Sequence, residues 1–224
     1  MKEPFEPLQA CDLKLLTLKT VFLTLLASGA RRGEIHALEA KSVSHTANWD
    51  QVTIEVIPEF ISKTAVRESG ATRFRSITIP ALTPFAGPDL PEGKLLCPVR
   101  AIKCYLARTK EFRQQQRRLF ISYQRNRKLD VGVNTISIWV KALLKLVYEL
   151  ADEQSSFLTG RTTHAIRALA SSWAFYKNVS VEQILRSCSW KNQTTFTSFY
   201  LKNLYQIKEE MHVLGPLVVA QSKV

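Results

Sequence analysis

The sequence has few cysteines and no close pair of them. Its four cysteines, Cys11, Cys97, Cys104 and Cys188, are scattered over 224 residues without a CxxC motif. Structural zinc sites and disulfide frameworks need cysteines at short, regular spacings, so neither is expected here. Reduced thiols in an intracellular protein are the simpler interpretation.

Long apolar segments are also missing. The most apolar run, residues 13–27, is interrupted by Lys14 and Lys19 and is shorter than a helix that crosses a bilayer. Residues 1–7 lack the apolar core that a signal peptide needs. We therefore expect neither a membrane-spanning helix nor a signal peptide.

Acidic residues are scarce relative to basic ones. The chain has 31 Lys and Arg against 19 Asp and Glu, a formal net charge of +12. Such an excess favours a polyanionic partner, either nucleic acid or an anionic membrane surface. Because many basic proteins bind neither specifically, charge alone makes DNA only the first expectation.

Hydrophobic residues make up 46% of the chain, which is enough for a buried core. Residues 51–57 and 73–79 are rich in β-branched side chains and are predicted to be strands, joined by a long hairpin with Lys63 and Gly70. The proline-rich stretch 80–93 is predicted to be a loop. A mostly helical α+β fold with a small antiparallel sheet is therefore expected. Its predicted helices cover residues 12–27, 31–38, 98–108, 134–150, 163–176, 181–188 and 195–211.

Two clusters of polar residues start helices. In the first, Gly29 ends an apolar helix and Arg31 follows, where backbone N–H groups would favour a phosphate, with Glu34 in reach. In the second, His164 and Arg167 share one helical face, and Thr162 or Thr163 is expected to cap that helix. Taken alone, the first cluster is explained slightly better as a surface ion pair beside a helix cap, and a histidine near an arginine is common by chance.

The third cluster is aromatic and precedes the C-terminal part of the chain. Trp190 is followed by Tyr200, which the predicted helix 195–211 places beside Phe196 and Phe199. Taken alone, Tyr200 is better explained as a core aromatic and Trp190 as a packing residue.

The joint order of these residues resembles the catalytic domain of tyrosine recombinases, a family that includes lambda integrase and Cre. The shared order is G-x-R-x-x-E, a lysine between two strands, H-x-x-R, tryptophan and tyrosine, over about residues 5–205. The resemblance implies six catalytic residues, which are Arg31, Lys63, His164, Arg167, Trp190 and Tyr200. Residues 5–8, 96–101, 118–121 and 166–171 look closer to recombinases of DIRS- and Ngaro-type retroelements and related eukaryotic mobile elements, which would work in a nucleus.

Some positions depart from the family pattern. Trp190 stands where histidine is usual, and its spacing to Tyr200 is one residue longer than in Cre-like members. Tyr205 is therefore an alternative nucleophile, although its spacing fits less well. Arg32 competes with Arg31, but the glycine and glutamate spacing favours the latter. Three arginines crowd the hairpin around the expected lysine: Arg67, Arg73 and Arg75.

The resemblance also implies a mechanism. Tyr200 would attack a phosphate of double-stranded DNA, forming a 3′-phosphotyrosyl bond and releasing a 5′-hydroxyl, with His164 as general base. Arg31 and Arg167 would brace the non-bridging oxygens, Lys63 would protonate the leaving oxygen, and the indole N–H of the tryptophan would contact the phosphate. Neither a metal nor a cofactor is needed in such a scheme.

By the same resemblance, residues 1–212 form the catalytic domain and residues 213–224 an apolar tail, without the N-terminal clamp domain that relatives usually carry. Self-association on DNA as a dimer or tetramer is expected, with the tail docking on a neighbour or on its own domain. Three alternatives remain: a non-catalytic DNA-binding descendant, a type IB topoisomerase-like activity, and a role at a membrane surface.

Overall fold

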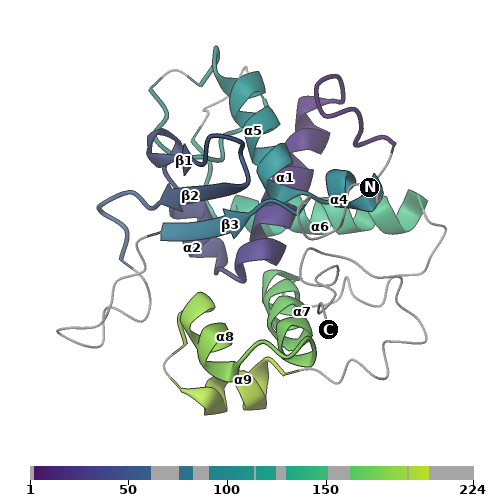
Figure 1. The fold of residues 1–224 in the computed structure, drawn as a ribbon. Helices are drawn as coiled ribbons and strands as arrows, with labels where there is room; N and C mark the ends of the chain where they lie inside the picture. The colour runs from purple at the N-terminus through teal and green to yellow at the C-terminus, as the bar shows by residue number, and fades with distance from the viewer. Residues whose placement is uncertain are drawn as a thin grey trace.

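The structure, a computed structural model, describes residues 3–61, 76–82, 91–113, 115–124, 130–150, 162–190 and 192–201. Helices and one small sheet make up these parts (Figure 1). In chain order they are α1 (Leu13–Ser28), α2 (Arg32–Ala37), the 3-10 helix η1 (Ala40–Ser42), β1 (Ser44–His45), β2 (Gln51–Glu55), β3 (Ser76–Pro80), α4 (Pro91–Leu95), α5 (Pro98–Thr109), α6 (Val133–Leu150), α7 (Thr162–Tyr176), α8 (Val181–Ser187) and α9 (Gln193–Phe199).

Helix α1 forms the centre of the larger of two cores. Asp12 caps its start by accepting a hydrogen bond from the Lys14 N–H at 2.7 Å. Apolar side chains on all its faces bury it, and it packs against α5, α6 and α7. Its buried threonines need no outside partner, because each hydroxyl donates to the carbonyl four residues earlier; these are Thr17, Thr20 and Thr24.

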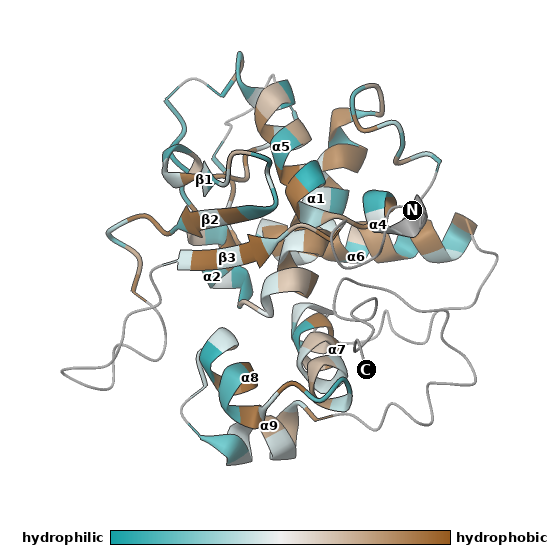
Figure 2. Ribbon diagram, viewed as in Figure 1, coloured by the Kyte–Doolittle hydropathy of each residue, from teal (hydrophilic) through white to brown (hydrophobic). Residues whose placement is uncertain are grey.

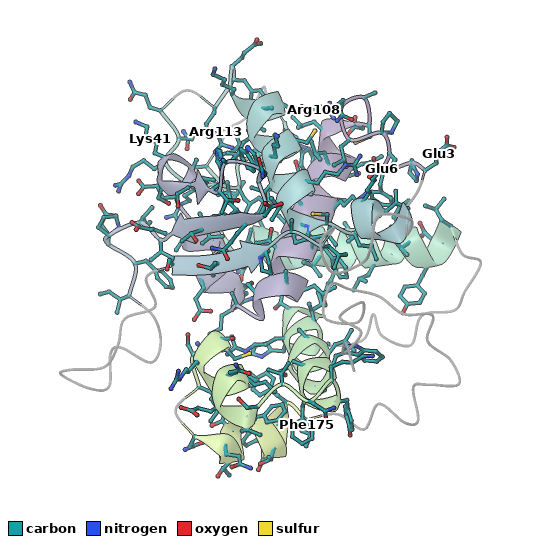
Figure 3. All side chains as sticks on the ribbon, viewed as in Figure 1. Glu3, Glu6, Lys41, Arg108, Arg113 and Phe175 are labelled. Atoms are coloured by element: carbon teal, nitrogen blue, oxygen red, sulfur yellow. The ribbon has the colours of Figure 1, made fainter. Side chains whose placement is uncertain are left out.

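The N-terminal segment is fixed onto α1 and α5. Glu6 accepts hydrogen bonds from Lys19 at 2.7 Å and from Arg100 at 2.8 Å, and Arg108 donates to two main-chain carbonyls of the segment. The Lys19 side chain is fully buried, and a buried ammonium requires such a carboxylate. Figure 3 labels Glu6 and Arg108 at this end of the molecule.

The antiparallel sheet has the order β1-β2-β3. Val52 pairs with Ile79 and Ile54 with Ile77, and all four side chains are buried in the larger core. Hydrophobic and hydrophilic residues alternate along β2 and β3, as a strand with one solvent-exposed face requires (Figure 2). Strand β1 was not predicted, because two residues are too few to show alternation.

Helices α7, α8 and α9 enclose a second, smaller core, which lies below the larger one in Figure 1. Helix α7 belongs to both cores, since Ile166 and Ala170 are part of the larger one. The junction between the two cores therefore runs along α7. The buried members of the smaller core are Ala174, Ile184, Cys188, Trp190 and Phe196.

The predicted fold class is confirmed, and most helices begin and end within one or two residues of the predicted bounds. Gly29 ends α1 as expected, and Ser180 caps α8 by accepting from the Gln183 N–H at 3.2 Å. Two predictions are wrong in detail. Thr162 and Thr163, the predicted caps of α7, lie inside its first turn, and the predicted loop 80–93 gives its last residues to α4, which Pro91 opens as a first helical residue.

The predicted helix 195–211 is also wrong in extent, because α9 ends at Phe199. Tyr200 is its C-cap with φ −120° and ψ −26°, and the N–H of Leu201 returns to the Phe196 carbonyl at 2.7 Å. This bond closes the last turn, so Tyr200 lies at the end of a helix and not within one. The predicted tail, residues 213–224, lies outside the described residues.

Candidate active site

The turn between α1 and α2 lies against the turn that follows α8. Gly29 has φ +59°, a left-handed conformation that side chains disfavour, and its N–H donates to the Leu25 carbonyl at 3.0 Å. A Cβ atom at this position would lie 3.0 Å from the Sγ atom of Cys188. Glycine therefore permits both the turn and the close approach of two segments that are far apart in the sequence.

Arg31 follows this turn and is held by a carboxylate. Its backbone N–H donates to Glu34 Oε2 at 2.6 Å, and its Nη1 donates to Glu34 Oε1 at 2.8 Å. The Nη2 atom of Arg31 lies 3.4 Å from the Ser189 carbonyl oxygen, to which it donates. The Arg31 side chain is 25% exposed and the Glu34 side chain 2%. The buried carboxylate therefore orients the guanidinium, part of which stays accessible.

Arg167 lies almost completely inside the protein, with 2% of its surface exposed. Its Nη2 donates to the Cys188 carbonyl, its Nη1 is 3.8 Å from Glu34 Oε2, and its Cζ lies 4.6 Å from the centre of the Trp190 ring. Burial lowers the pKa of Arg167, and the positive charge of Arg31 acts in the same direction. An arginine nevertheless stays protonated in proteins.

Two donor nitrogens of Arg167 are left without a hydrogen-bond acceptor. The atoms Nε and Nη1 are buried and have no partner within hydrogen-bonding geometry. A buried, charged donor that lacks an acceptor is unfavourable by several kcal/mol in general, and native proteins usually avoid it. Buried, charged donors of this kind can bind an anion.

The Tyr200 hydroxyl lies close to an imidazole nitrogen. His164 Nδ1 is 3.3 Å from the tyrosine Oη, and the two rings are roughly stacked with centres 6.4 Å apart. His164 is exposed and Tyr200 is half-buried, so the phenol is accessible from outside. The Arg167 Cζ lies 5.7 Å from the centre of the tyrosine ring.

Trp190 fills the space between the arginine and the tyrosine. Its ring centre is 4.4 Å from that of Tyr200, and its other neighbours are Arg167 and Phe196. The main chain reaches this position through Ser189, which has φ +49°, and the Trp190 N–H returns to the carbonyl of Leu185 at 2.9 Å. The ring thus fixes the distance between the guanidinium and the phenol.

The structure brings together five of the six residues that the sequence pattern selected. Arg31 comes from the α1–α2 turn, His164 and Arg167 from α7, Trp190 from the turn after α8, and Tyr200 from the end of α9. The sixth, Lys63, lies outside the described residues, and so do the alternatives around it and Tyr205. Tyr200 combines features of both interpretations, because it is half-buried against the smaller core while its hydroxyl lies 3.3 Å from Nδ1 of the exposed His164.

Sequence reasoning missed three contacts of this cluster. Glu34 was expected beside Arg31, but its carboxylate also lies 3.8 Å from Nη1 of Arg167 and so links the two arginines. The main-chain carbonyls of Cys188 and Ser189 accept from the two guanidiniums. No sequence signal marks a carbonyl as an acceptor, because every residue has one.

Two features are absent from the described residues. No group of three or more His, Cys, Asp or Glu side chains there is arranged to hold a metal ion. Nor does that part of the chain contain a helix with the length and hydrophobicity needed to cross a membrane.

Solved structures provide the informative comparison. No family model and no curated relative matches the sequence. The crystal structure of XerA recombinase matches 88% of this chain and 60% of its own, with a TM-score of 0.55 and 16% identity. The XerH site-specific recombinase, in a pre-cleavage complex with its difH substrate, matches 89% of this chain and 46% of its own, with a TM-score of 0.56 and 10% identity. The chain thus spans less than two thirds of either recombinase, and its described part has the fold of a tyrosine recombinase catalytic domain.

Proposed function

We propose that this chain breaks and rejoins double-stranded DNA through a 3′-phosphotyrosyl intermediate formed on Tyr200. One observation carries the proposal: the phenol oxygen lies 3.3 Å from an imidazole nitrogen and beside a buried arginine that has two unpaired N–H donors. A nucleophile, a base and an anion-binding group in contact are what phosphoryl transfer requires. The similarity in fold to XerA and XerH agrees with it.

Arg167 and Arg31 bind the scissile phosphate in this scheme. The unpaired Nε and Nη1 atoms of Arg167 donate to non-bridging oxygens, and the partly exposed Arg31 reaches the same group from the opposite segment. Negative charge grows on these oxygens as a fifth oxygen approaches phosphorus. Donors that are already fixed by protein contacts stabilise that charge without having to reorganise. The two guanidiniums supply the positive charge that a metal supplies in other phosphoryl-transfer enzymes.

Proton transfer begins at His164. The Nδ1 atom accepts the proton of the Tyr200 hydroxyl while the phenol oxygen bonds to phosphorus and the bond to the 5′-oxygen breaks. Lys63 gives a proton to the departing 5′-oxygen, so a hydroxyl leaves and no charge accumulates. Attack by a 5′-hydroxyl on the phosphotyrosine reverses each step, which rejoins DNA without an external energy source.

The wider role that we propose is strand exchange by a recombinase of a DIRS- or Ngaro-type mobile element, acting in the nucleus of a eukaryotic host. Sequence motifs support this subgroup, and the net charge of +12 supports a DNA partner. Strand exchange needs two duplexes, so self-association on DNA belongs to the same proposal. The apolar residues 214–220 of the tail are the segment that we propose to dock on a neighbouring copy.

The decisive experiment traps the covalent intermediate. A DNA duplex with a nick next to the cleavage position loses its 5′-hydroxyl fragment, so the phosphotyrosyl adduct accumulates and can be counted on a denaturing gel. The wild-type chain should form adducts, whereas Tyr200→Phe should form none and still bind DNA. Tyr176→Phe is the matched control, because it alters another tyrosine, the last residue of α7. It should keep adduct formation.

Each other outcome identifies an alternative. Adducts that persist in Tyr200→Phe but vanish in a Tyr205→Phe variant would move the nucleophile to Tyr205. DNA binding without any adduct in the wild-type chain would favour a non-catalytic DNA-binding descendant. Relaxation of supercoiled plasmid without strand exchange would favour an activity like that of type IB topoisomerases.

A further inference from the structure

Helix α7 contacts Tyr200 at two points, the phenol hydroxyl and the main-chain carbonyl. The phenol oxygen lies 3.3 Å from His164 Nδ1. The main-chain carbonyl of Tyr200 accepts a hydrogen bond of 2.9 Å from the hydroxyl of Ser172, which is fully buried. Ser172 lies about two helical turns after His164 on the same helix, so one rigid element contacts the nucleophile residue at its reactive atom and at its backbone.

The backbone of Tyr200 needs such an anchor. It is the C-cap of α9, a helix of 7 residues, and the last carbonyls of a helix have no partner inside it. The preceding residue, Phe199, is 73% exposed and contributes little packing at this point. The ring of Tyr200 rests on Trp190, and the N–H groups of Tyr200 and Leu201 donate to the Phe196 carbonyl, but none of these contacts binds the Tyr200 carbonyl.

We infer that Ser172 is a positioning residue for the cleavage step. Its hydroxyl fixes the carbonyl of Tyr200, and through it the place where the phenol meets His164. The inference depends on the proposed function, because Ser172 itself touches no reacting atom. Small displacements matter here, since an error of about 1 Å in the placement of a reacting group can slow a reaction about 100-fold.

Ser171 provides a matched control. It is also buried in α7, with 3% of its surface exposed, but its hydroxyl donates to carbonyls of its own helix, those of Arg167 at 2.9 Å and Ala168 at 3.2 Å. Ser171→Ala and Ser172→Ala therefore remove the same atom from neighbouring buried positions. Only the second variant releases the nucleophile residue.

The test compares the two variants in two measurements. The first is the single-turnover rate of adduct formation at saturating DNA, with the dissociation constant for DNA measured separately. Ser172→Ala should slow the step about tenfold, as expected for the loss of one orienting contact, and leave the dissociation constant unchanged. Ser171→Ala should change the rate less than about twofold, because it removes no orienting contact.

The second measurement is hydrogen exchange at the amides of Tyr200 and Leu201, both of which donate to the Phe196 carbonyl. Exchange should be faster in Ser172→Ala than in Ser171→Ala, without DNA and without any reaction. Equal cleavage rates or equal exchange in the two variants would overturn the inference. If the wild-type chain forms no adduct, the proposed function fails instead, and exchange alone decides whether Ser172 holds the end of α9.

Discussion

Replacement of Gly29 by alanine should destabilise the protein through two separable effects. The first is conformational: φ is +59°, and an L-residue in the left-handed region costs about 1–2 kcal/mol. The second is steric: the new Cβ would lie 3.0 Å from Cys188 Sγ, and overpacking of a well-packed site costs about 1–3 kcal/mol. Together they predict a loss of roughly 2–5 kcal/mol, which lowers the Tm of a chain of this size by roughly 4–20 °C.

Thermal unfolding of four variants and the wild-type chain separates the two effects. Gly33→Ala is the control, because its Cβ would meet Phe60 at an ordinary 3.9 Å and alanine favours the helix in which it lies. The double variant Gly29→Ala with Cys188→Ala removes the sulfur, so it should recover the steric part, about 1–3 kcal/mol, but not the conformational part. The cycle is completed by Cys188→Ala alone.

Two results would refute this reasoning. If Gly29→Ala unfolds at the same temperature as Gly33→Ala, the turn does not require glycine. If the two substitutions at positions 29 and 188 are simply additive, the sulfur is not what the Cβ meets. A second consequence concerns the site, since Cys188 also supplies the carbonyl that Arg167 binds. Gly29→Ala should therefore slow adduct formation even below the unfolding temperature.

Two further predictions concern single side chains. Arg167→Lys keeps the charge but loses the forked donors that bind the Cys188 carbonyl and, in the proposed mechanism, the phosphate. Single-turnover cleavage should therefore fall about 10²–10³-fold, while DNA affinity changes little. An unchanged rate would remove Arg167 from phosphate binding. Burial lowers the pKa of His36 below its ordinary 6.5, and the positive charge of Arg118 acts in the same direction, against the hydrogen bond to the Val131 carbonyl, which raises it. The contribution of His36 to the free energy of unfolding is then complete above pH 6.5 and declines as the pH falls below it. In urea unfolding below pH 6.5, the stability of His36→Gln should therefore depend less on pH than that of the wild-type chain. An identical pH dependence of the two would contradict the assignment.

Local signals explain why so much of the fold could be predicted. Asp12 and Gly29 bound α1, Ser180 starts α8, and the apolar periodicity of α5 and α6 needs no distant contact to be recognised. The end of α9 could not be predicted in this way. Residues 195–211 contain no glycine or proline that would break a helix. Ser172, whose hydroxyl donates to the Tyr200 carbonyl, is distant in sequence.

In the candidate site, too, the sequence predicts some features and not others. Residue order selected Arg31, His164, Arg167, Trp190 and Tyr200, because each side chain has a chemical property that such a reaction uses. The contacts that orient them come from groups without such a property: a glycine that has no side chain, the carbonyls of residues 188 and 189, and a serine hydroxyl. Order along the chain identifies reacting groups, whereas their placement depends on packing between segments that only folding brings together.

Glu34 explains how two arginines can share one site. Like charges this close repel, and the charge of Arg31 helps to lower the pKa of Arg167, while Glu34 raises it. The carboxylate does not treat the two equally: it lies 2.8 Å from the Nη1 of Arg31 but 3.8 Å from that of Arg167. It therefore neutralises one guanidinium by direct hydrogen bonding and leaves Nε and Nη1 of the other without a hydrogen-bond acceptor. The resulting net charge of the three groups, one positive unit, matches the single negative charge of a phosphodiester. In the proposed mechanism, a stronger bond between Glu34 and Arg167 would occupy the donors that we assign to the phosphate.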